Sequence, residues 1–141
     1  MADTRRELIL ARVKTNLDTI TTATVYRSRV EPLSRGEAPA IIVEPVSDQP
    51  NDGIVYTQLQ WLLRFRVMVV VRDNSLDDKA DEFTQLVHSK IMNDPTMNGT
   101  ALDTQADRVE FELYEADVPL TVVSMDYLVK YRSDRVDLTS T

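Results

Sequence analysis

The chain has no cysteine, only three glycines and a single histidine, His88, among its 141 residues. The absence of cysteine excludes disulfides, thiolate metal sites and thiol nucleophiles, and it is typical of proteins from a reducing compartment. No glycine-rich phosphate loop and no Gly-x-Ser-x-Gly turn of a serine hydrolase occurs. His88 lies at the edge of the apolar stripe of a predicted helix, so we expect a surface or boundary side chain. The sequence therefore predicts a protein that is not an enzyme and holds no cofactor and no metal.

Long apolar runs are also missing. The most apolar segment, Val55–Arg72, is interrupted by Arg64, Arg66 and two glutamines, so it does not fit a membrane span. The apolar run Leu8–Ala11 is too short for the apolar region of a signal peptide. The net charge of −7 argues against non-specific nucleic-acid binding, which depends on a field of Lys and Arg. We expect a soluble protein of the cytoplasm.

The most informative segment is Val55–Arg72, where apolar and polar residues alternate almost without a break. Side chains of a strand alternate between faces, so this pattern predicts one face on a core and one largely wet face. At about 3.3 Å per residue the strand would span roughly 60 Å, several times the usual length. It must project beyond the domain or bend at a bulge. Long projecting hairpins suit proteins that build assemblies.

Two amphipathic helices accompany this strand. Thr4-Arg5-Arg6-Glu7 has the spacing of a capping box and predicts a helix from Thr4 to about residue 19. The second helix covers Leu76–Met92, with an acidic first turn and one apolar face. The turn-forming residues of Ser47–Gly53 predict a loop. The remaining segments are strands at Val25–Val30, Pro39–Glu44 and Leu120–Arg132, a loop at 94–107, and a half-buried strand that turns Val109, Phe111 and Leu113 inward.

The predicted order is therefore α-β-β-β-α-β-β. The apolar stripes of both helices need a sheet to cover, which predicts a two-layer α+β fold with a mainly antiparallel sheet and a long central hairpin. A length of 141 residues fits a single domain over residues 1–141. Residues 133–141 form a polar tail, predicted to be frayed or docked on a partner.

Pairs of arginines on single strand faces are the main candidates for partner contacts. Such a pair is either an ordinary solvated face or a patch that meets acidic side chains of another subunit, where arginine is enriched. We predict subunit or partner contacts at the arginine pairs and in the loop 47–53. The candidate residues are Arg27, Arg29, Arg64, Arg66, Asp48, Asn51 and Asp52.

Taken together, this pattern resembles the tail terminator, or tail-completion, proteins of long-tailed bacteriophages. The resemblance covers roughly residues 4–132 and begins with the N-terminal helix. It includes the short strand Pro39–Val43, the long strand ending Arg64–Val71, the acidic-capped helix Leu76–Met92 and the closing strand Asp126–Arg132. The head–tail joining proteins of the phage neck look alike at this level, so the two classes stay open.

The resemblance implies a virion protein whose subunits form a ring, of six copies in this family. That ring would cap the tail tube, end its polymerisation, and offer its other face to head-completion or neck proteins. An acidic lumen would let genomic DNA pass without specific binding. The rival classes are a neck-joining protein, a small-ligand or enzyme domain, and a non-viral protein-binding module. If Arg64 and Arg66 form an intersubunit patch, reversing both charges should impair ring formation and leave the melting temperature within a few degrees.

Overall fold

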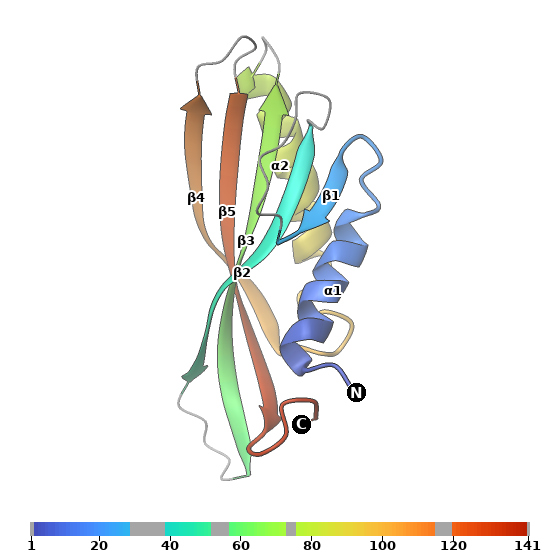
Figure 1. Ribbon diagram of the computed structural model, residues 1–141, viewed down its shortest axis with the longest axis vertical. Coiled ribbons are helices and arrows are strands. Elements are labelled where there is room, and N and C mark those ends of the chain that lie inside the picture. The colour runs from blue at the N-terminus through green and yellow to red at the C-terminus, as the bar shows by residue number, and fades with distance from the viewer. Residues whose placement is uncertain (1, 29–38, 52–56, 73–75, 115–119, 141) are drawn as a thin grey trace.

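The computed structural model describes residues 2–28, 39–51, 57–72, 76–114 and 120–140. One five-stranded sheet, in the order β1-β2-β3-β5-β4, carries both helices on the same face (Figure 1). Only β1 and β2 pair in parallel; the other three pairs are antiparallel. The predicted α+β class and element order are confirmed. The elements are α1 (Arg5–Leu17), β1 (Thr24–Arg27), β2 (Ala40–Asn51), β3 (Gln58–Arg72), α2 (Leu76–Met92), β4 (Asp103–Tyr114) and β5 (Leu120–Asp134).

The main core lies between the helices and the sheet. Phe65 of β3 and Tyr127 of β5 stack at its centre, with ring centroids 5.5 Å apart. The predicted inward face of β5 is confirmed, and so are the described members of the predicted stripe on α2. The core residues from α1, β3, α2 and β5 are Ile9, Leu10, Val13, Leu17, Leu63, Phe65, Val67, Val69, Val71, Ala80, Phe83, Val87, Ile91, Val123, Met125, Tyr127, Val129 and Tyr131.

Half of the predicted capping box forms at the start of α1. The backbone N–H of Glu7 donates to the Thr4 hydroxyl at 3.2 Å, so Thr4 is the N-cap. The Glu7 carboxylate accepts two hydrogen bonds from Arg27 of β1 instead, at 2.6 and 3.0 Å. This bidentate pair ties α1 to the first strand of the sheet.

The loop predicted at Ser47–Gly53 is wrong over its described part. Residues 47–51 continue β2 and pair with β3 up to Asn51, which lies opposite Gln60. Strands usually exclude proline because it has no N–H to donate, yet Pro45 and Pro50 are accommodated here. The reason is that β1 pairs only with residues 40–43, so the rest of β2 is an edge among the described residues.

Two bulges mark a waist in the sheet. The register of β2 shifts between Pro45 and Ser47, and that of β4 shifts between Ala106 and Arg108. Both shifts lie level with the Phe65–Tyr127 pair. Bulges increase the local twist, and the twisted sheet makes the ribbons of β2, β3, β5 and β4 overlap near the middle of the view in Figure 1. Beyond the waist, residues 47–51 of β2, 58–64 of β3 and 128–134 of β5 form an arm, beside which β4 runs only from Asp103 to Ala106.

Several predicted boundaries change. The long strand begins at Gln58, since Thr57 lies in a turn and residues 55 and 56 fall outside the described residues. The loop predicted at 94–107 is wrong at its end, because β4 begins at Asp103, opposite Lys130. The first strand ends at Arg27, and Ser28 takes a positive φ of 49°. The segments 29–38 and 73–75 lie outside the described residues.

The described part of the C-terminal tail contacts its own chain. The backbone N–H of Asp134 donates to the Ser140 carbonyl at 2.7 Å, and that of Arg5 donates to the Leu138 carbonyl at 2.8 Å. The tail therefore closes over the N-terminus of α1, at the lower end of the molecule in Figure 1. Neither of the two described helices is long and apolar enough to cross a membrane.

Candidate interaction surface

The outer strand β4 exposes an apolar row. Val109, Phe111 and Leu113 are 48%, 72% and 70% exposed. They lie opposite Met125, Val123 and Thr121 of β5, so they share the face on which the helices pack. Since α2 packs over β3 and β5, β4 lies beyond the helix layer. The inward burial predicted for these three residues is therefore wrong.

A groove runs between α2 and this row. It encloses about 280 Å³ and is lined by Asp81, Gln85 and His88 of α2 and by Val109 of β4, among others. His88 Nδ1 lies 3.1 Å from the Tyr127 hydroxyl at its floor, and burial raises the pKa of Tyr127 to about 12. The phenol thus stays protonated at neutral pH. Within the described segments, no group of three His, Cys, Asp or Glu side chains could hold a metal ion.

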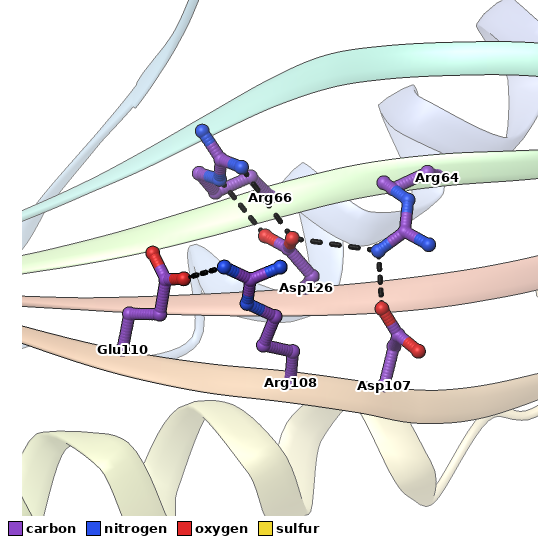
Figure 2. Close-up of polar contacts among 6 residues, drawn as sticks. All are labelled: Arg64, Arg66, Asp107, Arg108, Glu110 and Asp126. Carbon is purple, nitrogen blue, oxygen red and sulfur yellow. Dashed lines mark hydrogen bonds and ion pairs between the residues drawn. The ribbon is translucent and has the colours of Figure 1, made fainter.

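On the opposite face of the sheet, six charged side chains form an ion cluster across β3, β5 and β4 (Figure 2). Its centre is Asp126, whose side chain is only 7% exposed. Arg66 donates to Asp126 through Nε at 2.8 Å and Nη2 at 3.4 Å, and Arg64 reaches it at 3.5 Å. Arg64 also pairs with Asp107 at the bulge of β4, and Arg108 pairs with Glu110. Arg64 and Arg66 are thus paired with carboxylates of their own chain.

The ion cluster lowers the pKa of its central carboxyl. Burial alone would raise the pKa of Asp126, but the hydrogen bonds from Arg66 and the charges of Arg66, Arg64 and Arg108 outweigh it. The pKa of Asp126 is therefore lower in the folded chain than in the unfolded one. The stabilisation is fully present above the unfolded value, about 3.9, and is lost as the pH falls through the folded value.

We predict that Asp126→Asn costs stability at neutral pH and progressively less in acid. The free energy of unfolding of wild type and variant should differ most above about pH 5 and converge as the pH falls below about 4. Urea unfolding at a series of pH values measures this difference. Asp103→Asn, at an exposed aspartate of β4, controls for the substitution itself. A difference that is constant from pH 7 to pH 3 would show that the charge of Asp126 is not what stabilises the fold.

The other predicted contact residues lie in separate places. Arg27 pairs with Glu7 at the opposite edge of the sheet from β4. Arg29 falls outside the described residues. Asn51 ends β2, its side chain undescribed, and Asp52 lies outside the described residues. The structure brings Arg64 and Arg66 together but neither with Arg27 nor with Asp48. That these residues contact another subunit stays a prediction.

Asp48 is turned inward, at the joint between the arm and α1. Its side chain is 6% exposed, accepts a hydrogen bond from the Tyr131 hydroxyl and pairs with Arg6 at 3.3 Å. Burial raises the pKa of Asp48 more than Tyr131 and Arg6 lower it. Trp61 stacks on Tyr131 and donates to the Ser133 hydroxyl at 2.8 Å. The arm is thus a packed extension of the core on the helix side.

Comparison with known proteins adds one result about the fold. A solved structure of 15% sequence identity aligns over 89% of this chain and 96% of that chain, with a TM-score of 0.52. The similarity concerns the fold alone. No protein-family model matches the chain, and no curated protein sequence matches it. The name of the similar structure states no activity, binding partner or assembly.

Two features of the surface are not predicted by the sequence. Asp126, the buried centre of the ion cluster, reads as one polar residue in an alternating strand, and only pairing with β3 and β4 reveals its role. The exposure of Phe111 has the same origin, because burial in a strand depends on what covers it. The sequence contains one indication that this strand is an outer one, because Glu110 and Glu112 flank Phe111. Charged side chains are common in edge strands.

Proposed function

We propose that this chain is a structural subunit of a long-tailed phage virion, of the tail terminator type. Its copies form a ring on the end of the tail tube, stop tube growth and present a surface to the head-completion or neck proteins. The observation that carries the proposal is the apolar row of β4, with Phe111 72% and Leu113 70% exposed on a strand edge that no other described strand covers. An open, long and apolar edge is a template for pairing with another chain.

The arm supports an assembly role in a second way. It carries β2, β3 and β5 beyond the waist, which gives a subunit reach toward a neighbour or toward the tube. A tube grows by repeating one heterologous interface, and growth ends when a subunit copies only one side of that interface. With a net charge of −7 the ring would let DNA pass through its lumen without binding it specifically.

Loss of the gene tests this function against its nearest rival. In the phage genome that carries it, deletion should give tails longer than those of the wild type, measured by electron microscopy of lysates. Complementation with the wild-type gene restores the length, whereas a Phe111→Asp gene is expected to fail. Tails of normal length beside unattached heads would instead identify a neck-joining protein. Normal virions without the gene would favour a non-viral binding module.

A further inference from the structure

We propose that the subunits join edge to edge, with β4 of one copy pairing antiparallel to β1 of the next, so that one sheet continues through the ring. This inference rests on the proposed function, because it names the partner of the open β4 edge as a second copy of this chain. It also identifies the β1 edge of that second copy as the surface that pairs with β4. The two surfaces are the β4 edge (residues 108–114) and the β1 edge (residues 24–27).

The strand directions allow this pairing without a change of orientation. β1 and β4 are the two outer strands of the sheet. β1 runs parallel to β2, and each further step to β3, β5 and β4 reverses the direction. β4 therefore runs opposite to β1. A neighbour placed in the same orientation beside β4 offers its β1 as an antiparallel partner, and its helices stay on the same face.

The two faces of each edge also match. Val25 of β1 lies opposite Ile41 of the main core, so it faces the helix side, as Phe111 does on β4. Thr24 faces the other side of the sheet, as Glu112 does. In the joined sheet the apolar row meets Val25 and lies beside the neighbour's α1, which covers β1. That contact supplies the cover that β4 lacks in the single chain.

Charge complementarity selects this partner over a second β4 edge. The elements at the β1 side, α1 and β1, contain five basic residues and one acidic residue. β4 contains four acidic residues and one basic residue, and the described side chains of α2, which packs over the adjacent strand β5, add two acidic and two basic residues. Head-to-tail association places the acidic side against the basic side, whereas β4 against β4 would place two acidic sides together. Heterologous contacts of this kind close into a ring when the rotation between neighbours completes a circle, and otherwise give an open filament.

The remaining open edge is less suited to pairing. Beyond Val43, β2 has an open edge among the described residues, but it carries Pro45 and Pro50. Proline has no N–H to give to an added strand, so these residues protect that edge. β4 contains no proline and no glycine. Its bulge at Asp107 leaves residues 108–114 as a regular edge.

The chain contains no cysteine, so introduced cysteines can form disulfides only with each other in a crosslinking test. Two variants carry Thr24→Cys together with either Glu110→Cys or Glu112→Cys, all on the helix-free face. At a concentration where the ring forms, mild oxidation should convert most of one variant into a ladder of covalent multimers on a denaturing gel. Opposed residues of an antiparallel pair come close enough for a disulfide. Thr24→Cys with Arg132→Cys, a residue on the arm, is the matched control and should stay below a tenth crosslinked.

The outcomes separate this inference from the proposed function. The mass of each reduced variant, from light scattering, shows whether it still assembles. If it assembles and neither pair crosslinks, the β4–β1 contact is wrong and the ring stands. If Glu112→Cys alone gives covalent dimers, β4 pairs with itself and the inference is overturned. If no variant and no wild type assembles, with or without tube ends, the proposed function fails as well.

Discussion

Replacing Phe65 by alanine is expected to lower the free energy of unfolding by about 3–5 kcal/mol. Phe65 is fully buried, stacks on Tyr127 and lies level with both bulges. Truncation leaves a cavity there that the paired strands cannot close, so the cost of this cavity adds to the lost transfer free energy of the removed atoms. Urea unfolding followed by the fluorescence of Trp61 measures the loss.

Phe111→Ala is the matched control, because it removes the same side chain from a neighbouring region of the same sheet. Phe111 is 72% exposed, so its truncation should change the free energy of unfolding by no more than about 0.5 kcal/mol. The comparison is made at a concentration low enough to keep both proteins monomeric. Equal losses for the two variants would mean that β4 is covered in the free chain, contrary to the structure.

Reversing the charge of Arg66 is expected to destabilise the monomer. Arg66→Glu places a carboxylate beside Asp126, whose side chain is 7% exposed and loses its closest cation. Breaking a buried pair costs about 3–5 kcal/mol, and partial exposure of the Arg66 side reduces this to roughly 2–4 kcal/mol. The melting temperature should fall by about 10 °C. The sequence alone predicts a change of only a few degrees when Arg64 and Arg66 are both reversed, so the structure changes that expectation.

A charge-swapped variant tests the pairing itself. Arg66→Glu combined with Asp126→Arg should recover only part of the lost stability, because it restores this one attraction with the signs exchanged while Arg64 and Arg108 repel the new cation. Arg132→Glu, on the same face of the sheet but in the arm, controls for the change in net charge. An Arg66→Glu protein as stable as Arg132→Glu would contradict the ion cluster. It would also return Arg66 to the candidates for a subunit contact.

The sequence predicts best where burial depends only on local period. The inward face of β5 and the apolar stripe of α2 follow from spacings of two and of three to four residues, and both are confirmed. Phe111 has the same alternating surroundings as Phe65, yet one is exposed and the other buried. The difference comes from strand order, since β3 is central and β4 is outermost. Strand order depends on non-local pairing, which a single sequence does not display.

The error in the predicted loop Ser47–Gly53, over its described residues 47–51, has a similar cause. Asp, Asn, Ser and Pro favour turns through local backbone preferences, and these are real in this segment. Pairing with β3 outweighs them, and prolines are tolerated because that half of β2 is an edge. Asp48 shows the consequence: a residue expected on a loop surface is buried against Tyr131 and Arg6.

The sequence predicts that Arg64 and Arg66 share one face of a strand, but it does not predict which residues they contact. Alternation places Arg64 and Arg66 on one face of a strand, and that face is confirmed by their shared contact with Asp126. The partner lies 60 residues from Arg66 in the chain, on a strand whose register no local pattern gives. The candidate assembly surface therefore moves from these arginines to β4, whose apolar row has no partner among the described residues.

The mass of the wild-type protein, from light scattering behind size exclusion over a wide concentration range, tests the account most directly. We expect a monomer at low concentration and, at high concentration or with tube ends added, a discrete ring of about six subunits with a central hole in negative-stain images. Phe111→Asp should shift the assembly midpoint at least about tenfold, since burying one unpaired charge costs more than 1.4 kcal/mol. A wild type that stays monomeric under all these conditions, or a Phe111→Asp variant that assembles as readily, would contradict the account.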